Sequence, residues 1–335
     1  MTSLLPSRKS RATGADQSAE AGVLRRLQDA GVAPFVVLLV LVAVIGLVDG
    51  RFLTPRSLAS LLEQSTPLAL LAIGQCLVVL TGRIDLSNAA LASLAGVLLA
   101  QFLGPLGVVA VPLVLLGGAL ASALAGWIHV TAQVPSFVVT LGALGVWSGA
   151  SLVLAQSDTI LVTDGYQYVE WIFTRWSRVV PVSFLLVLAV TLVLMWAMRG
   201  LPAGRQLKAI GLNERAAAYS GIRTQAMVNL AFAGSGLFAA GAAVFQIAQL
   251  QSAGASTSAS LLLPAIAAVI IGGTAISGGV GGVGRTLIGA LIISVLRVGL
   301  DIVGVDSAVQ PILYGLIVIL AIAATVDRRR TLVVA

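Results

Sequence analysis

This chain has 335 residues, of which 58% are hydrophobic and 10% are charged, and its net charge is +7. Soluble domains carry about 25% charged residues, so the composition excludes an ordinary water-soluble enzyme. Lipid offers the backbone no hydrogen-bond partners, so only helices or closed barrels can span a bilayer. Barrel strands alternate polar and apolar residues, whereas these segments are apolar all round. The predicted fold class is therefore all-α, polytopic and membrane-embedded.

Ten apolar segments follow one another along the chain, each close to the roughly 20 residues that a membrane span needs. They lie near residues 32–49, 59–80, 86–103, 106–128, 135–155, 180–198, 226–249, 260–277, 284–301 and 307–326. We predict an N-terminal tail over 1–30, a transmembrane domain over 31–327 and a C-terminal tail over 328–335. An even number of spans places both tails on one side.

The basic residues fix that side. They gather in the N-terminal tail, in the central loop 199–224 and in Arg328–Arg330, and basic loops stay in the cytoplasm. We therefore predict a bacterial inner-membrane protein with both termini cytoplasmic, in which the clustered charge reports topology rather than nucleic-acid binding. The longest outer loop, 156–179, is rich in Tyr and Trp. It is expected to anchor at the lipid headgroups or to contact a delivery protein.

One cysteine, Cys76, and one histidine, His129, exclude an intrachain disulfide and argue against a transition-metal site. His129 lies at a predicted helix end, where the helix dipole favours a cation, and we do not interpret it as catalytic. No catalytic residue and no cofactor are expected.

Two short segments, 81–88 and 272–284, interrupt the helical pattern, each before a helix of small residues. Paired interruptions in the two halves of a transporter indicate an internal repeat and a site at the bilayer midplane. Arg83 and Asp85, in the first segment, are functional candidates or charges of a turn that reaches water. The candidate pathway residues offer polar or backbone groups, although each could instead contact a neighbouring helix: Gln75, Asp85, Ser87, Asn88, Ser136, Thr140, Gly272, Gly273 and Thr274.

The central loop is long enough to hold a helix of its own. Asn213 can cap that helix before Glu214, Gly221 can end it, and Ala216, Ala217 and Ser220 would leave one face smooth for a soluble partner. The alternative is an ordinary polar loop with a frayed helix.

Four stretches resemble one known family. The segment from Gly204 to Ile222 is similar to the cytoplasmic coupling helix of the ribose-type sugar permeases of ABC importers. Gly82–Ser87, Pro135–Gly142 and Ala265–Gly279 resemble three further motifs of that family, in order along 35–326. The resemblance implies that these residues couple the chain to an ATPase: Gly211, Asn213, Glu214, Ala216, Ala217, Ser220 and Gly221.

The same resemblance implies several partners: an ABC ATPase on another chain, a periplasmic binding protein, and a second permease chain, identical or different, within the lipid. The chain has no G-x-x-x-x-G-K-[ST] phosphate loop, so we predict a transport subunit and not an enzyme. The glycine segment 279–284 matches G-x-G-x-x-G by letter, but it joins two spans, so a tight turn is expected.

The chain departs from the family at Asn88-Ala89, where Val-Gly is usual, at Leu262–Pro264, where an acidic residue is usual, and at Val298, where Asn is usual. Two of these departures lie beside the predicted pathway, so the resemblance does not carry ribose over as the substrate. A monosaccharide or similar polyol is expected. Alternatives are a branched-chain amino acid, another small polar solute, or ion-driven transport using Glu63, Asp85 or Arg297.

Overall fold

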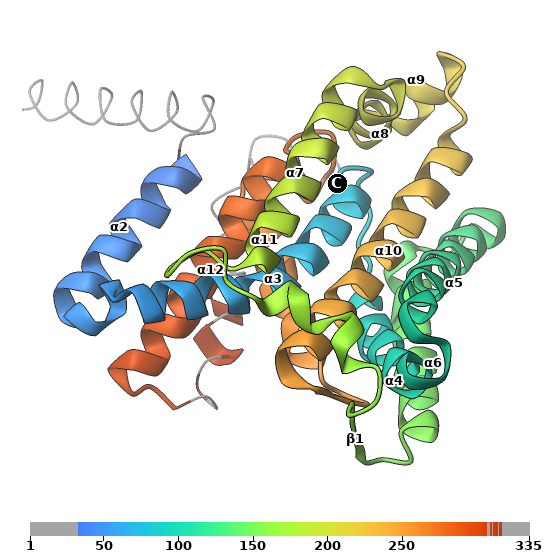
Figure 1. Ribbon diagram of the computed structural model, residues 1–335. Helices are drawn as coiled ribbons and strands as arrows, with labels where there is room; N and C mark the ends of the chain where they lie inside the picture. The colour runs from blue at the N-terminus through green and yellow to red at the C-terminus, as the bar shows by residue number, and fades with distance from the viewer. Residues whose placement is uncertain (1–32, 307–308, 310, 314, 317–335) are drawn as a thin grey trace, which may run out of the picture.

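The computed structural model describes residues 33–306, 309, 311–313 and 315–316, and these are mainly helical (Figure 1). The predicted tails, 1–30 and 328–335, and most of the tenth predicted span, 307–326, lie outside the described residues. Six apolar stretches among the described residues are long enough to cross a bilayer, and one of them, Asn88–Ala132, combines two helices. The prediction of an all-α membrane fold is confirmed, whereas the number of spans stays a prediction.

The apolar helices are α2 (Ala33–Val48), α3 (Pro55–Val79), α4 (Asn88–Leu106), α5 (Ala110–Ala132), α6 (Ser136–Leu154), α7 (Val182–Gly200), α10 (Thr224–Leu250), α11 (Leu262–Ile271) and α12 (Val283–Val303). Short 3-10 turns, η1 (Gly50–Leu53) and η2 (Gly107–Val109), join α2 to α3 and α4 to α5. The eighth predicted span, 260–277, is shorter than expected. At 1.5 Å per residue, α11 extends about 15 Å, which is about half of the hydrocarbon thickness. The helix ends early because glycines follow it.

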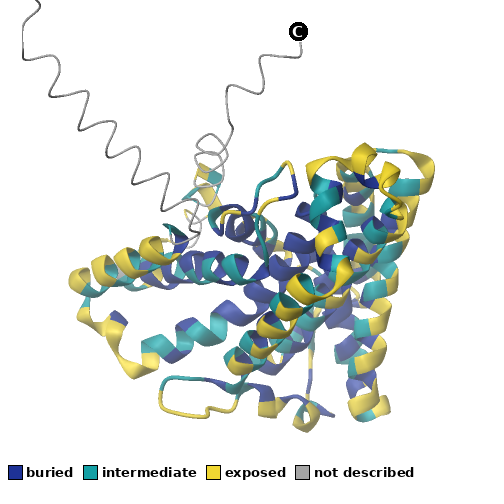
Figure 2. Cartoon of the chain, turned by 90° about the horizontal axis from the view of Figure 1, so that it is seen from above, coloured by how far each residue is buried: buried dark blue, intermediate teal, exposed yellow. Residues whose placement is uncertain are grey.

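Burial separates a central helix from peripheral ones. In α3, 83% of the most apolar window is buried, compared with 11% in α6 and 17% in α7. Figure 2 shows the buried residues gathered in the middle and the exposed ones on the outer helices. Helix α6 leaves Phe137, Leu141 and Val146 exposed. This side of the helix therefore faces lipid or another chain and not the core of its own chain.

Both interrupted segments meet at one point, which we call the glycine junction: Gly82, Gly211 and Gly278. The amide of Gly279 donates to the carbonyl of Leu80 at 2.9 Å. A Cβ on Gly278 would lie 2.5 Å from the Gly82 nitrogen and 2.8 Å from the Gly211 Cα. Gly82 and Gly278 also have positive φ angles, of 76° and 85°, which glycine adopts without steric cost. Segments far apart in sequence therefore touch through their backbones.

The opposite end of the molecule is closed by a small folded cap. Strand β1 (Thr159–Leu161) pairs antiparallel with β2 (Ser252–Gly254), and the turns η3 (Tyr166–Tyr168), η4 (Glu170–Phe173) and η5 (Ala259–Leu261) complete it. The Tyr166 hydroxyl donates to the carbonyl of Ala248 at 2.8 Å. Trp171 and Trp176 are 50% and 80% exposed, so this cap presents aromatic rings to its surroundings. Whether they anchor in lipid or contact a delivery protein stays a prediction.

We predict that Gly211→Ala destabilises the protein by about 1–3 kcal/mol, because the added methyl group would overlap the backbone of Leu80 and Gly279. The matched control is Gly200→Ala, since no atom lies within 4 Å of the position of that Cβ. Unfolding in detergent, followed by circular dichroism, measures both. Equal stability of the two variants would contradict the close packing of the junction.

Candidate functional site

The central loop forms two helices rather than one. Helix α8 (Pro202–Leu212) precedes α9 (Glu214–Tyr219), and both lie at the end of the molecule opposite β1 (Figure 1). The side-chain oxygen of Asn213 accepts from the amide of Ala216 at 3.0 Å, and Gly221 follows α9 with a φ of 84°. The predicted cap and stop are both confirmed. Helix α8 was not predicted, although it buries Leu207 and Ile210 and exposes Arg205 as an amphipathic helix does.

The predicted coupling residues divide between two faces. Ala217 packs into the core, and Gly211 belongs to the glycine junction, so neither faces outward. The others are exposed: Asn213, Glu214, Ala216, Ser220 and Gly221. Tyr219 is 92% exposed and Leu212 is 69% exposed. The outward surface therefore includes two large apolar side chains that were not among the predicted coupling residues. An aromatic residue on a short polar helix could have indicated this binding surface from the sequence.

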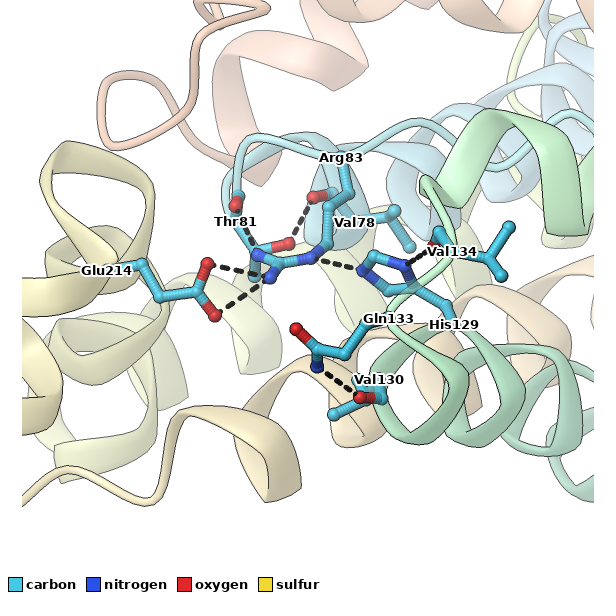
Figure 3. Close-up of polar contacts among 8 residues, drawn as sticks. All are labelled: Val78, Thr81, Arg83, His129, Val130, Gln133, Val134 and Glu214. Carbon is cyan, nitrogen blue, oxygen red and sulfur yellow. Dashed lines mark hydrogen bonds and ion pairs between the residues drawn. The ribbon is translucent and has the colours of Figure 1, made fainter.

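Arg83 connects α9 to the rest of the protein (Figure 3). Its Nη2 donates to both carboxylate oxygens of Glu214, at 2.8 and 2.9 Å. Its Nε donates to Nε2 of His129 at 2.7 Å, and its Nη1 donates to the carbonyl of Thr81 at 2.9 Å. All three guanidinium nitrogens are thus used, and only 14% of the side chain is exposed. A planar guanidinium held in this way has a fixed orientation.

His129 carries the connection further, to the turn between α5 and α6. Its Nδ1 lies 2.6 Å from the carbonyl of Val134. Because Arg83 donates to Nε2, that nitrogen must be an acceptor, so the proton is on Nδ1 and the ring is neutral. The sequence analysis expected the helix dipole to favour a cation here, and that expectation is wrong: the neighbouring guanidinium supplies the positive charge, and the imidazole accepts from it.

Asp85 is the centre of a second, fully buried set of hydrogen bonds. One carboxyl oxygen accepts from the amide and the hydroxyl of Ser87, at 2.9 and 2.7 Å. The other accepts from the hydroxyl of Ser235 on α10 at 2.8 Å, and more distantly from Ser122 on α5 at 3.4 Å. Its side chain does not reach water. A buried polar group requires such partners, and here they join the segment 81–88 to two distant helices.

Gln75 and Asn88 lie beside this set, with their side-chain amide groups 3.2 Å apart and Nδ2 of Asn88 donating to the carbonyl of Leu71 at 3.4 Å. With its amide oriented to suit its neighbours, Gln75 donates to the Asp85 carbonyl at 2.9 Å and accepts from the Asp85 amide at 3.3 Å. From α6, Ser136 accepts from the amide of Ile84, and Thr140 donates to its carbonyl, both at 3.4 Å. The structure therefore brings six predicted pathway residues together around 81–88: Gln75, Asp85, Ser87, Asn88, Ser136 and Thr140.

The remaining predicted pathway residues, Gly272, Gly273 and Thr274, lie on the second interrupted segment. The Thr274 hydroxyl is 3.9 Å from the sulfur of Cys76, which follows Gln75 on α3. The two sets of candidate pathway residues are thus linked through α3, while the segments that carry them touch at the glycine junction. Sequence reasoning missed Ser122 and Ser235, since the only signal was a hydroxyl within an apolar helix, and such residues usually bond to their own backbone.

Comparison with known proteins identifies the family. Residues 57–322 match the family described as branched-chain amino acid transport system / permease component. The chain is a member of this permease family. It is 32% identical over 291 residues to the ribose import permease protein of Escherichia coli, covering 86% of this chain and 91% of that protein. It is 33% identical over 314 residues to the ribose import permease protein of Bacillus subtilis, covering 92% and 95%.

The D-allose transport system permease protein of Escherichia coli is 30% identical over 295 residues, covering 86% of this chain and 89% of that protein. These relatives confirm the predicted resemblance to ribose-type permeases. The permease is therefore a multi-pass protein of the bacterial inner membrane and a transport subunit.

The three-way contact of Arg83 gives a testable prediction. Arg83→Lys keeps the charge but loses the fixed fork, so we expect a destabilisation of about 1–3 kcal/mol. Arg175→Lys is the control, because Arg175 also pairs with an acid, Glu63 at 2.9 Å, with its side chain 44% exposed. That change is expected to stay within about 0.5 kcal/mol. Unfolding in detergent measures the stability of both variants. If Arg83→Lys is as stable as the unaltered protein, the three-way contact of Arg83 does not hold α9 in place.

The two serines that share one oxygen of Asp85 form a second matched pair. Ser235→Ala removes a 2.8 Å hydrogen bond and Ser122→Ala removes one of 3.4 Å. We expect a loss of about 1.5–3 kcal/mol for Ser235→Ala, as for hydrogen bonds to charged groups. Ser122→Ala should cost less than about 1 kcal/mol. The same unfolding measurement applies, and the reverse ranking would show that Ser235 does not hold the carboxyl group.

Proposed function

We propose that this permease is the membrane-spanning subunit of an ABC importer that carries a monosaccharide or similar polyol across the inner membrane. An ATPase on a separate chain drives it, and a periplasmic binding protein delivers the solute. The observation that carries the proposal is the contact of Arg83 with Glu214 and His129, because it joins the exposed helix α9 to the polar segment 81–88 and to the α5–α6 turn.

The outward face of α9 is the proposed ATPase contact. Tyr219 and Leu212 supply apolar area, whereas Ala216 and Ser220 are small enough for a partner's cleft to close over them. Aromatic anchors of this kind dominate binding energy at protein interfaces. The basic residues of the loop favour a cytoplasmic position for it, and an even number of spans would put both termini on that side. Asn213 and Gly221 shape the helix, and Gly211, Glu214 and Ala217 pass its displacement inward.

Displacement of α9 has two routes into the membrane domain. The ion pair to Arg83 leads to 81–88 and, through His129, to the α5–α6 turn, while the glycine junction leads to the second interrupted segment. Helix α6 is the least buried of the long helices, so it is the element freest to move. The buried polar groups of α3, 81–88 and α6 then face the pathway only after α6 moves. A second permease chain, identical or related, covers the exposed side of α6.

The polar set favours a neutral, hydroxyl-rich solute. Around 81–88 the available groups are hydroxyls and amides, and the carboxyl of Asp85 is already saturated. A zwitterionic amino acid would require a free negative charge for its ammonium group, in addition to a helix end such as the start of α4 at Asn88. The named sugars of the curated relatives agree with this choice.

Ion-driven transport is a weaker candidate. It needs acids that can bind a cation inside the membrane. Glu63 is engaged in the ion pair with Arg175, Asp85 has its hydrogen bonds filled, and Arg297, itself a cation, cannot coordinate one. We therefore place the energy source on the partner ATPase.

Reconstitution tests the proposal. In proteoliposomes containing the permease, its ATPase and its binding protein, we expect ATP-dependent uptake of a labelled monosaccharide such as ribose or allose. Tyr219→Ala should weaken ATPase binding about thirtyfold, as loss of an interface anchor does, and should reduce uptake in parallel. Tyr168→Ala, at the opposite end of the molecule, is the control for ATPase binding and should leave that binding unchanged.

Three outcomes would contradict the proposal. Uptake of leucine in place of any monosaccharide would select the amino-acid alternative. Uptake that collapses with a protonophore while ATP is present would select ion coupling. Normal ATPase binding by Tyr219→Ala, together with weakened ATPase binding by Tyr168→Ala, would move the docking surface to the end of the molecule opposite α9.

A further inference from the structure

A basic cavity of about 570 Å³ lies beside the last turn of α7. Its walls come from α7, α8, the glycine segment 279–284 and the start of α12. Three cations line it, Arg199, Lys208 and Arg285, and its lining contains no acid. None of the three forms an ion pair with another described residue. The cavity therefore carries positive charge that the described part of the chain leaves unneutralised.

The backbone adds further donors to the same cavity. Helix α12 begins at Val283, and its N-cap residue, Gly282, provides no side-chain hydrogen bond. The first N–H groups of a helix have no partner within it and favour an anion. The amide of Gly279, which also lines the cavity, is already bonded to Leu80, so the free backbone donors are the first N–H groups of α12. The combination of cationic side chains and free amides suits phosphate oxygens.

An apolar groove of about 330 Å³ adjoins this cavity. The two share one lining residue, Met198. Every residue that lines the groove is apolar or glycine. Leu194 and Ala197 on α7 and Leu207 on α8 line the groove, next in sequence to the cavity residues Met195, Met198 and Lys208. A soluble anion would use the cavity and leave the groove unexplained. A molecule with an anionic head and a hydrocarbon tail uses both.

The surroundings are those of a lipid surface. Only 17% of the apolar window of α7 is buried, and Trp196, which follows the lining residue Met195 in the sequence, is 67% exposed. Tryptophan is enriched where a helix reaches the lipid headgroups. Basic cavities between helices on the cytoplasmic side bind the headgroups of anionic lipids.

We propose that the cavity binds the phosphodiester headgroup of an anionic phospholipid and that an acyl chain of that lipid lies in the groove. Arg199, Lys208 and Arg285 donate to the phosphate oxygens. The site adjoins the glycine junction, because Gly279 lines the cavity and donates to Leu80, and Lys208 lies on α8 with Gly211. A bound lipid thus braces α8 against α12, at the point where both interrupted segments meet.

Native mass spectrometry of the full-length protein in detergent tests this site. Phosphatidylglycerol and phosphatidylcholine with the same acyl chains are the probes. We expect the unaltered protein to bind phosphatidylglycerol at least tenfold more tightly. Lys208→Gln and Arg285→Gln should each weaken that binding about fivefold. Arg205→Gln, on α8 but absent from the lining of the cavity, should change it less than twofold.

The groove is tested separately with Ala197→Phe, which fills it. We expect this variant to bind phosphatidylglycerol several-fold more weakly while binding of inorganic phosphate is unchanged. Equal binding of the two lipids by the unaltered protein, a measurement that needs no variant, would overturn the proposal. So would a loss in Arg205→Gln as large as that in Lys208→Gln. Displacement of the lipid by millimolar phosphate, with Ala197→Phe unaffected, would reassign the cavity to a soluble anion.

Discussion

The guanidinium group of Arg83 is the contact on which the organisation of this permease depends. It is held by a carboxylate from α9, an imidazole from α5 and a carbonyl of its own segment. Without it, α9 would be attached to the membrane domain mainly through Ala217 and its chain ends. With it, a short exposed helix is tied to the polar segment 81–88, because a planar fork with all three nitrogens engaged leaves little rotational freedom.

The polar contacts around Asp85 and the backbone contacts of the glycine junction have the same physical origin. In an apolar protein, a polar group that loses its partner has no water to replace it. The hydroxyls of Ser87 and Ser235 therefore hold Asp85 in one arrangement. At the junction, the absence of side chains lets three segments approach until their backbones touch. Both devices hold the centre together, whereas α6 is bonded to the segment 81–88 through the long hydrogen bonds of Ser136 and Thr140 to Ile84.

Helices α8 and α9 present two different surfaces. The outward side of α9 offers Tyr219 to a soluble partner, whereas the inner side of α8 places Lys208 in the basic cavity and Leu207 in the apolar groove. The proposed ATPase contact and the proposed lipid site thus act on one short connected unit. A lipid that braces α8 would stiffen the same unit that the ATPase displaces, so membrane composition and ATP-driven movement would act on a shared element.

The sequence by itself determined the all-α membrane fold, most of the helix positions, the Asn213 cap, the Gly221 stop and the two interrupted segments. Each of these depends on residues within a few positions of one another, through hydrophobic periodicity, capping or glycine dihedral angles. Only the tertiary structure decided that Ala217 faces inward and that His129 accepts from Arg83. Arg83 and its partner Glu214 are 131 residues apart, and Asp85 and its partner Ser235 are 150 residues apart. Such pairs are set by how the helices pack, and no local pattern encodes them.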